Sequence, residues 1–284
     1  MSRLLRLFAF LACLGAAQAH AQYGPEYPVG DDTSYTALWW VPTESGWGLN
    51  TNHQGDIVFA TLFTYAPDGQ PMWLVAPSLN GIPGERYFTG TLYRTTGPPF
   101  NQVPWSAIGV TAVGSMSIEF YTSALATVSY TFNGTTISKT VERQVFSAGV
   151  PECVKEESSR AGVANYQDLW WNPAESGWGI NMVQQATIIF ATLFTYAPSG
   201  RDLWVVGPAL HRQLDGTYEG ALYTTSGTTF NASPWIAVSV AEVGRMNIRF
   251  TAGNRATLTY TLNGVQVVKS IERQVFQAAA PACR

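Results

Sequence analysis

The chain carries one long sequence pattern twice. Trp-Trp-x-Pro-x-Glu-Ser-Gly-Trp-Gly occupies residues 39–48 and returns at 170–179. Residues 59–67 return unchanged at 190–198, and Glu-Arg-Gln-Val-Phe at 142–146 returns at 272–276. A match that runs through a unit of roughly 120 residues indicates duplication of a whole domain, not a short solenoid repeat. We place the repeats at 33–153 and 164–284, with a polar, charged linker at 154–163.

Within each copy the apolar residues follow a period of two. In residues 57–65, Ile57, Phe59, Phe63 and Tyr65 share one face of a predicted strand, and the smaller side chains share the other. Turn residues separate this strand from the next, and the Asn-Gly pairs at 133–134 and 263–264 predict tight hairpins. Further strands are expected at 72–76, 87–93, 115–121, 126–132 and 136–146.

These patterns predict an all-β protein. No window of ten or more residues after the N-terminal segment has a convincing helical period. Seven or eight consecutive antiparallel strands per repeat favour a meander closed into a small β-barrel, because closure removes exposed strand edges. A pair of β-sandwiches is the alternative.

The first 21 residues are typical of a secretory signal peptide. Arg3 and Arg6 precede an apolar run, and Ala19-His20-Ala21 is a small-x-small cleavage site. A lipid anchor at Cys13 is the less favoured alternative, because the apolar stretch before it is too short. We therefore expect a secreted or periplasmic protein. An outer-membrane barrel is disfavoured because the strands look too short.

Charge excludes two classes of partner. The formal net charge is −3, and removal of the two signal-peptide arginines makes it −5. Without a basic patch, nucleic acid and anionic lipid are not expected partners. No later stretch is long and apolar enough for a transmembrane helix. The oligomeric state is left open.

Two cysteines remain after the signal peptide. Cys153 and Cys283 hold equivalent positions, each two residues after a proline. Export permits oxidation, so we predict a disulfide between them that ties the two domain ends together. Its loop of about 130 residues corresponds to roughly 4–5 kcal/mol in the chain-entropy treatment. Two free thiols or a bridge between chains are the alternatives.

The repeated motifs resemble a family of exported proteobacterial domains that often occur in tandem. The resemblance rests on Trp-Trp-x-Pro-x-Glu-Ser-Gly-Trp-Gly and Glu-Arg-Gln-Val-Phe and covers nearly all of both repeats. It implies export and a tandem organisation, and it transfers no catalytic residues. The predicted meander is also similar to avidin- and lipocalin-like barrels, in architecture alone.

The search for catalytic chemistry yields one residue pair. His53 and His211 have Gln184 and Asn80 as counterparts, so neither belongs to a duplicated site, and no metal site or cofactor is expected. Nucleophile and phosphate-loop motifs are absent from the sequence. Glu44 and Glu175 are retained in both copies. They could serve as acid or base in a hydrolase or lyase, or could simply accept hydrogen bonds from the glycine-bearing turn.

The aromatic residues are the more informative set. Neighbouring strand positions face opposite sides, so one of Trp39 and Trp40 points outward and must meet another surface. Each tryptophan of Gly-Trp-Gly is flanked by glycines that cover little of the ring. Flat aromatics beside amides suit stacking on sugars or enclosing a small apolar ligand. The predicted ligand-binding residues are Trp47, Trp178, Glu44, Glu175, Asn50, Asn181, Gln54, Gln185, Trp105 and Trp235.

The leading hypothesis is an exported, non-enzymatic binding protein with one aromatic-rich site per repeat. Its ligand would be a carbohydrate or a small apolar or envelope molecule. The polymer-acting hydrolase or lyase that uses Glu44 and Glu175 is the first alternative. A purely structural envelope module is the second, and it predicts that all ten indoles are buried.

Overall fold

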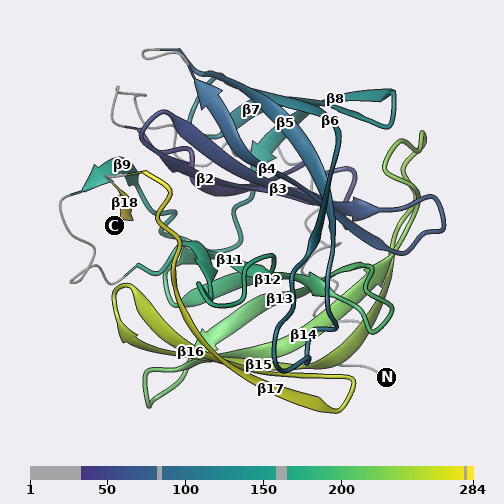
Figure 1. The fold of residues 1–284 in the computed structure, drawn as a ribbon. Helices are drawn as coiled ribbons and strands as arrows, with labels where there is room; N and C mark the ends of the chain where they lie inside the picture. The colour runs from purple at the N-terminus through teal and green to yellow at the C-terminus, as the bar shows by residue number, and fades with distance from the viewer. Residues whose placement is uncertain (1–32, 82–84, 158–164, 278–279) are drawn as a thin grey trace.

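The structure is a computed structural model that describes residues 33–81, 85–157, 165–277 and 280–284. The predicted signal peptide and most of the predicted linker lie outside the described residues. None of the described residues is helical, and each repeat closes into an eight-stranded antiparallel barrel. The all-β class and the tandem barrels are therefore confirmed, and the sandwich alternative is wrong. Figure 1 shows the two barrels packed against each other.

Both barrels are meanders in which each strand pairs with the next and the last pairs with the first. The first barrel contains β1 (Ala37–Trp40), β2 (Gly48–Gln54), β3 (Ile57–Tyr65), β4 (Pro71–Gly81), β5 (Tyr87–Thr96), β6 (Gly109–Phe120), β7 (Leu125–Phe132) and β8 (Thr135–Arg143). The second contains β10 (Asp168–Trp171), β11 (Gly179–Gln185), β12 (Ile188–Tyr196), β13 (Asp202–Arg212), β14 (Tyr218–Ser226), β15 (Ser239–Ala252), β16 (Arg255–Leu262) and β17 (Val265–Arg273).

Local sequence explains the hairpins and the inward faces. Asn133 and Gly134 both have positive φ, which is the backbone conformation that a two-residue hairpin turn requires. The inward residues of β3 are Val58, Ala60 and Leu62, and all three are fully buried. Side chains of this kind fill an eight-stranded barrel, so the interior is a packed core.

The outward face of β3 carries larger side chains than the inward face. Phe63 and Tyr65 point out of the first barrel, yet they are buried. They belong to a third apolar cluster together with Phe194, Tyr196 and Trp204 of the second repeat. This cluster fills the interface between the barrels, where β4 and β13 lie against each other.

Each barrel also inserts a loop into the other. Phe100, in the loop at 97–108 between β5 and β6, belongs to the core cluster of the second barrel. Phe230, in the equivalent loop at 227–238, belongs to the core cluster of the first. The backbone N–H of Phe100 donates to the carbonyl of Tyr196, and that of Phe230 donates to the carbonyl of Tyr65. The exchange is reciprocal, so the repeats are related by a pseudo-two-fold axis.

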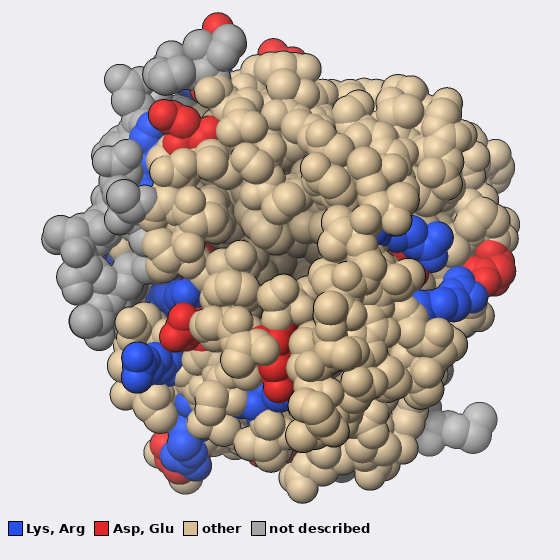
Figure 2. Space-filling view, in the orientation of Figure 1, with Lys and Arg blue, Asp and Glu red and all other residues tan. Residues whose placement is uncertain are grey.

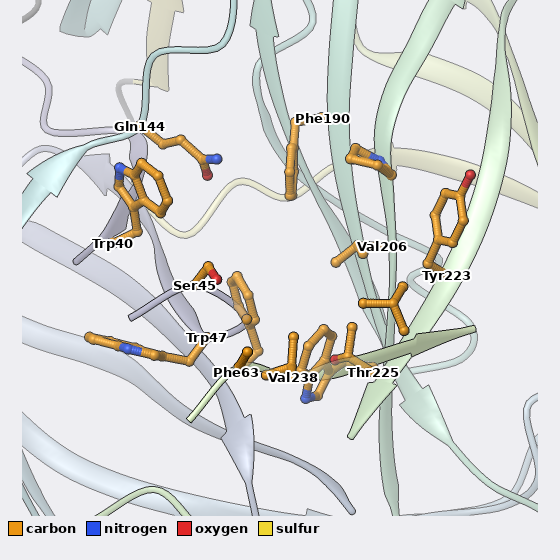
Figure 3. Close-up of a pocket in the computed structure, with 15 residues that line it drawn as sticks. Trp40, Ser45, Trp47, Phe63, Gln144, Phe190, Val206, Tyr223, Thr225 and Val238 are labelled. Carbon is orange, nitrogen blue, oxygen red and sulfur yellow. The ribbon is translucent and has the colours of Figure 1, made fainter. Parts of the chain in front are cut away.

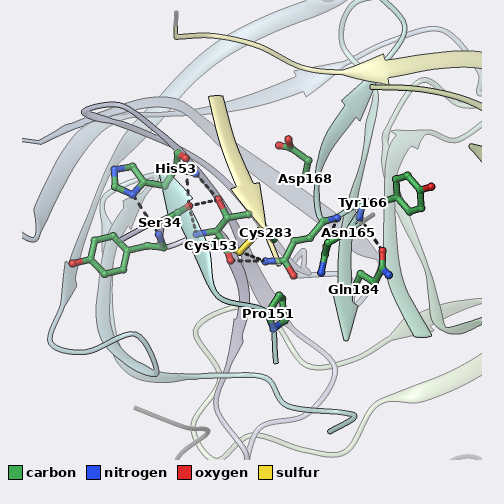
Figure 4. Close-up of a disulfide and its surroundings, with 12 residues drawn as sticks. Ser34, His53, Pro151, Cys153, Asn165, Tyr166, Asp168, Gln184 and Cys283 are labelled. Carbon is green, nitrogen blue, oxygen red and sulfur yellow. Dashed lines mark hydrogen bonds between the residues drawn. A yellow bond between two sulfur atoms is a disulfide. The ribbon is translucent and has the colours of Figure 1, made fainter. Parts of the chain in front are cut away.

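The predicted disulfide between Cys153 and Cys283 is present, at a sequence separation of 130. The cysteines are opposed in a two-stranded sheet formed by β9 (Cys153–Glu157) and β18 (Ala280–Cys283). Figure 4 shows this disulfide and its surroundings. The amide of Gln167 lies 3.5 Å from the Cys153 sulfur and donates to the Thr36 carbonyl at 2.7 Å. The ends of both repeats are therefore fastened at one point.

Candidate functional site

The Glu-Ser-Gly-Trp-Gly segment forms a hydrogen-bonded cluster in each repeat. The Glu44 carboxylate accepts the Trp47 indole N–H at 3.1 Å and the Lys139 ammonium at 2.5 Å. In the second repeat, Glu175 accepts from Trp178 at 3.0 Å and from Lys269 at 2.8 Å. The two predicted acid/base residues thus bind an indole and an ammonium group within their own barrel.

The same segment holds the loop that arrives from the other barrel. Trp235 donates its indole N–H to the Ser45 carbonyl at 3.0 Å, and Lys139 Nζ lies 5.5 Å from the Trp47 ring and 6.0 Å from the Trp235 ring. Trp105 donates to the Ser176 carbonyl in the equivalent way. Gly46 has φ of +104°, and a Cβ there would collide with Val238. The motif therefore contacts the other repeat directly, through its backbone carbonyl and its glycine.

Gln54 and Gln185 also connect the repeats. The Gln54 side chain is fully buried. It donates to the Gln274 carbonyl at 2.9 Å and accepts the Phe276 backbone N–H at 3.0 Å. Gln185 makes the matching bonds to the segment after β8, through the Gln144 carbonyl and the Phe146 N–H. The two glutamine amides therefore hold the Gln-Val-Phe backbone of each repeat against the other barrel.

Asn50 and Asn181 lie in the interface itself. Both are buried on the outward faces of β2 and β11. Asn181 Oδ1 accepts the Asn52 amide at 2.6 Å. The Nδ2 atoms of Asn50 and Asn181 find no hydrogen-bond partner in the described part of the chain.

Two grooves open between the barrels and are related by the pseudo-two-fold axis. The first, here the Trp40 groove, combines Trp40, Ser45 and Phe63 of the first repeat with residues of β12–β15, and its cavity volume is about 220 Å³. The second, the Trp171 groove, combines Trp171 and Ser176 with residues of β3–β6, and its volume is about 480 Å³. Figure 2 shows a hollow in the face where the barrels meet, and this face is mostly uncharged.

The two grooves are lined by matching residues. Fourteen lining residues of the Trp40 groove have their duplicated counterparts in the Trp171 groove. Thirteen of these pairs have the same amino acid, and Val238 with Ile108 is the pair that differs. In the barrel interiors, by contrast, counterparts interchange among apolar types, as in Leu74 with Val205 and Val128 with Leu258. The duplication has kept the groove walls more closely than the cores.

Three tryptophans line each groove, and Trp40 and Trp171 are the half-buried ones. Alternation on β1 buries Trp39 completely inside the barrel and leaves Trp40 half-buried outside. In Figure 3, Trp40 and Gln144 stand on one side of the cavity, with Phe190 and Tyr223 opposite, while the Trp47 indole extends away from it. The predicted residues Trp47 and Trp178 also line the grooves, but they are only 4% and 6% exposed. The in–out alternation at Trp39 and Trp40 was the signal that could have selected Trp40.

The grooves are apolar and uncharged. Their lining residues, all within the described ranges, include no Asp, Glu, Lys, Arg or His. The polar side-chain groups are a few hydroxyls, the indole N–H groups and one glutamine amide per groove, Gln144 in one and Gln274 in the other. Burial raises the pKa of the Tyr223 phenol, so this wall residue adds no charge to the groove.

Two further findings concern other kinds of site. Within the described residues, no group of three or more His, Cys, Asp or Glu side chains could hold a metal ion. The same residues contain no helix of the length and hydrophobicity needed to span a membrane.

Comparison with known proteins returns no match, either to a family model, to a curated protein or to a solved structure. The resemblance of the repeated motifs to exported tandem domains therefore stays a prediction.

Proposed function

We propose that this is a binding protein that takes uncharged, largely apolar molecules in two equivalent grooves between its barrels. The observation that carries the proposal is the near-identity of the two sets of lining residues, whereas the core residues of the two barrels differ more in sequence. Concave, aromatic-lined sites at domain interfaces are a common place for small ligands.

The barrel interiors are poor candidates for the site. Their inward side chains are packed, and each core cluster also includes a phenylalanine from the other repeat. A ligand in the interior would have to displace these side chains. The grooves offer space without such displacement, and Trp40 and Trp171 present half-buried indoles to it.

The composition of the groove walls favours an apolar ligand over a carbohydrate. A buried charge needs a partner, and the lining residues supply none, so a neutral ligand fits best. A sugar needs many hydrogen-bond partners when it is desolvated, whereas these walls are mainly Trp, Phe, Val and Pro. Glu44 and Glu175 are engaged by an indole and an ammonium group, which supports a structural role for both.

The test is titration with N-phenyl-1-naphthylamine, an uncharged fluorescent probe, with a panel of oligosaccharides as competitors. We expect two probe molecules per chain and no displacement by sugars. Trp40→Ala should weaken one site and Trp171→Ala the other, each by about ten-fold, which corresponds to about 1.4 kcal/mol of lost contact. Glu44→Gln is the matched control in the adjacent cluster and should leave probe binding unchanged.

Absence of probe binding would refute the proposal. Displacement by oligosaccharides would refute the apolar assignment and favour the carbohydrate alternative. Equal loss of binding in Glu44→Gln and Trp40→Ala would show that the grooves respond only to general loosening of the interface, and the assignment of Trp40 to a ligand site would fail.

A further inference from the structure

The Trp171 groove differs from the Trp40 groove in one buried polar residue that lines it. Thr61, on the outward face of β3, lines the Trp171 groove although only 3% of it is exposed. Its counterpart Thr192 is fully buried and does not line the Trp40 groove. The Trp171 groove is also the larger, at about 480 Å³ against about 220 Å³. One groove therefore reaches a polar layer that the other does not.

This polar layer lies directly beside Thr61. Asn50 is opposite Thr61 in the β2–β3 pairing, and Asn181 is opposite Thr192 in the β11–β12 pairing. Opposed side chains on one face of an antiparallel pair are about 4.5–5.5 Å apart at Cβ. Asn52 joins the layer by donating to Asn181 at 2.6 Å, and its counterpart is Val183. The extra asparagine makes the first repeat's side of the layer more polar than the second's.

The layer contains unsatisfied hydrogen-bond donors. Asn50 Nδ2 and Asn181 Nδ2 are buried and have no partner among the described residues, and the two asparagines are 1% and 2% exposed. Buried amide groups are almost always hydrogen-bonded. An amide N–H₂ group can only donate, so the missing partner has to be an acceptor.

We propose that the Trp171 groove binds a neutral amphipathic molecule whose carbonyl oxygen lies at Thr61, beside the Asn50 amide, while the Trp40 groove takes only the apolar body of such a molecule. This rests on the proposed function. A carbonyl fits better than a carboxylate, because the lining residues of the Trp171 groove include no cation to pair with a negative charge.

The experiment compares two probes with one apolar body: 2-acetylnaphthalene, which carries a carbonyl, and 2-ethylnaphthalene, which does not. Calorimetric titration of Trp40→Ala reports on the Trp171 groove, and titration of Trp171→Ala reports on the Trp40 groove. The ratio of the two probe affinities is compared between grooves, so the different water solubilities of the probes cancel. We expect the ratio to favour the ketone about ten-fold more in the Trp171 groove.

Variants of the polar layer locate the acceptor site. In the Trp40→Ala background, Thr61→Val should remove the ketone preference, and Thr192→Val is the matched control that should keep it. Asn50→Leu provides a second variant, because replacing a buried amide whose Nδ2 has no partner with an apolar group of similar size is not expected to destabilise the fold. It should also abolish the lowering of the ketone carbonyl stretching frequency that infrared spectroscopy would detect on binding.

Equal affinity ratios in the two grooves, or a ratio unchanged by both Thr61→Val and Asn50→Leu, would overturn this inference. If 2-ethylnaphthalene still bound in both grooves in that case, the proposed function would stand and only the carbonyl site would be refuted. Failure of both probes to bind in either groove would instead refute the proposed function.

Discussion

Truncation of the two exchanged phenylalanines should destabilise the barrel that receives each side chain, not the barrel that supplies it. Phe100 belongs to the first repeat and is 6% exposed within the second barrel's core. Phe230 is 7% exposed within the first barrel's core. Phe100→Ala should therefore loosen residues 168–273, and Phe230→Ala should loosen residues 37–143.

The magnitude follows from burial. Replacing a buried Phe by Ala removes apolar contact and leaves a cavity, at a cost of about 3–5 kcal/mol. Phe230 meets Phe132 edge-on with ring centroids 5.0 Å apart, whereas Phe100 and Tyr260 are 6.3 Å apart. Aromatic pairs contribute about 0.5–1.5 kcal/mol beyond area, so Phe230→Ala should be the more costly. In both variants the loop keeps its backbone hydrogen bond to the other barrel.

Hydrogen exchange read by mass spectrometry is the assay, because it reports protection strand by strand. We expect Phe100→Ala to raise exchange in β15, β16 and β17 while β6, β7 and β8 keep wild-type protection. Phe230→Ala should give the reverse pattern. Val103→Ala is the control in the same loop as Phe100, since Val103 is 84% exposed and should change neither barrel.

A loss of protection confined to the barrel that carries the substitution would refute the reciprocal arrangement. Equal loss in both barrels would show that they unfold as one unit, and the assignment of each phenylalanine to a separate core would then have no measurable consequence.

Two further predictions concern stability. Burial, and to a smaller extent repulsion from Lys155, lowers the pKa of His53 from 6.5 to about 4. The folded protein therefore favours the neutral imidazole, and this contribution to the free energy of unfolding is complete above pH 6.5. It is lost as the pH falls towards 4, by up to about 3 kcal/mol. His53→Gln introduces the amino acid found at the equivalent position 184. It should make the denaturation midpoint less dependent on pH between 6.5 and 4, and a pH dependence equal to that of the wild type would contradict the assignment. Replacing both Cys153 and Cys283 by Ala should lower the free energy of unfolding by about 4–5 kcal/mol, because the bridge closes a loop of 130 residues. A denaturant midpoint equal to that of the wild type would show that β9 and β18 hold the ends together without it.

Features set by neighbouring residues could be predicted from the sequence. Alternation in residues 57–65 located β3 at the bounds that the structure has. Asn-Gly at 133–134 located the hairpin between β7 and β8, because few residues other than Asn and Gly adopt positive φ readily. The equivalent positions of Cys153 and Cys283 predicted their pairing. Each of these depends on backbone geometry or on duplication, and both can be read along the chain.

The candidate site was only partly predictable. Alternation at Trp39 and Trp40 required one indole to face outward, but it could not say what that indole would meet. Trp47 was chosen because flanking glycines cover little of its ring, and the structure covers it with Trp235 of the other repeat instead, at 6.5 Å between centroids. That neighbour is separated from Trp47 by more than one whole repeat in sequence, so no local pattern could reveal it.

The sequence by itself therefore determined two duplicated barrels, their hairpins and the residue types on each strand face. Only the tertiary structure decided which outward faces meet each other, which loop fills which core and where uncovered space is left between the barrels. The physical reason is that strand periodicity and turn conformation are local properties of the backbone. The grooves, in contrast, are what remains after two curved surfaces have packed together, and their walls come from strands that are distant in the chain.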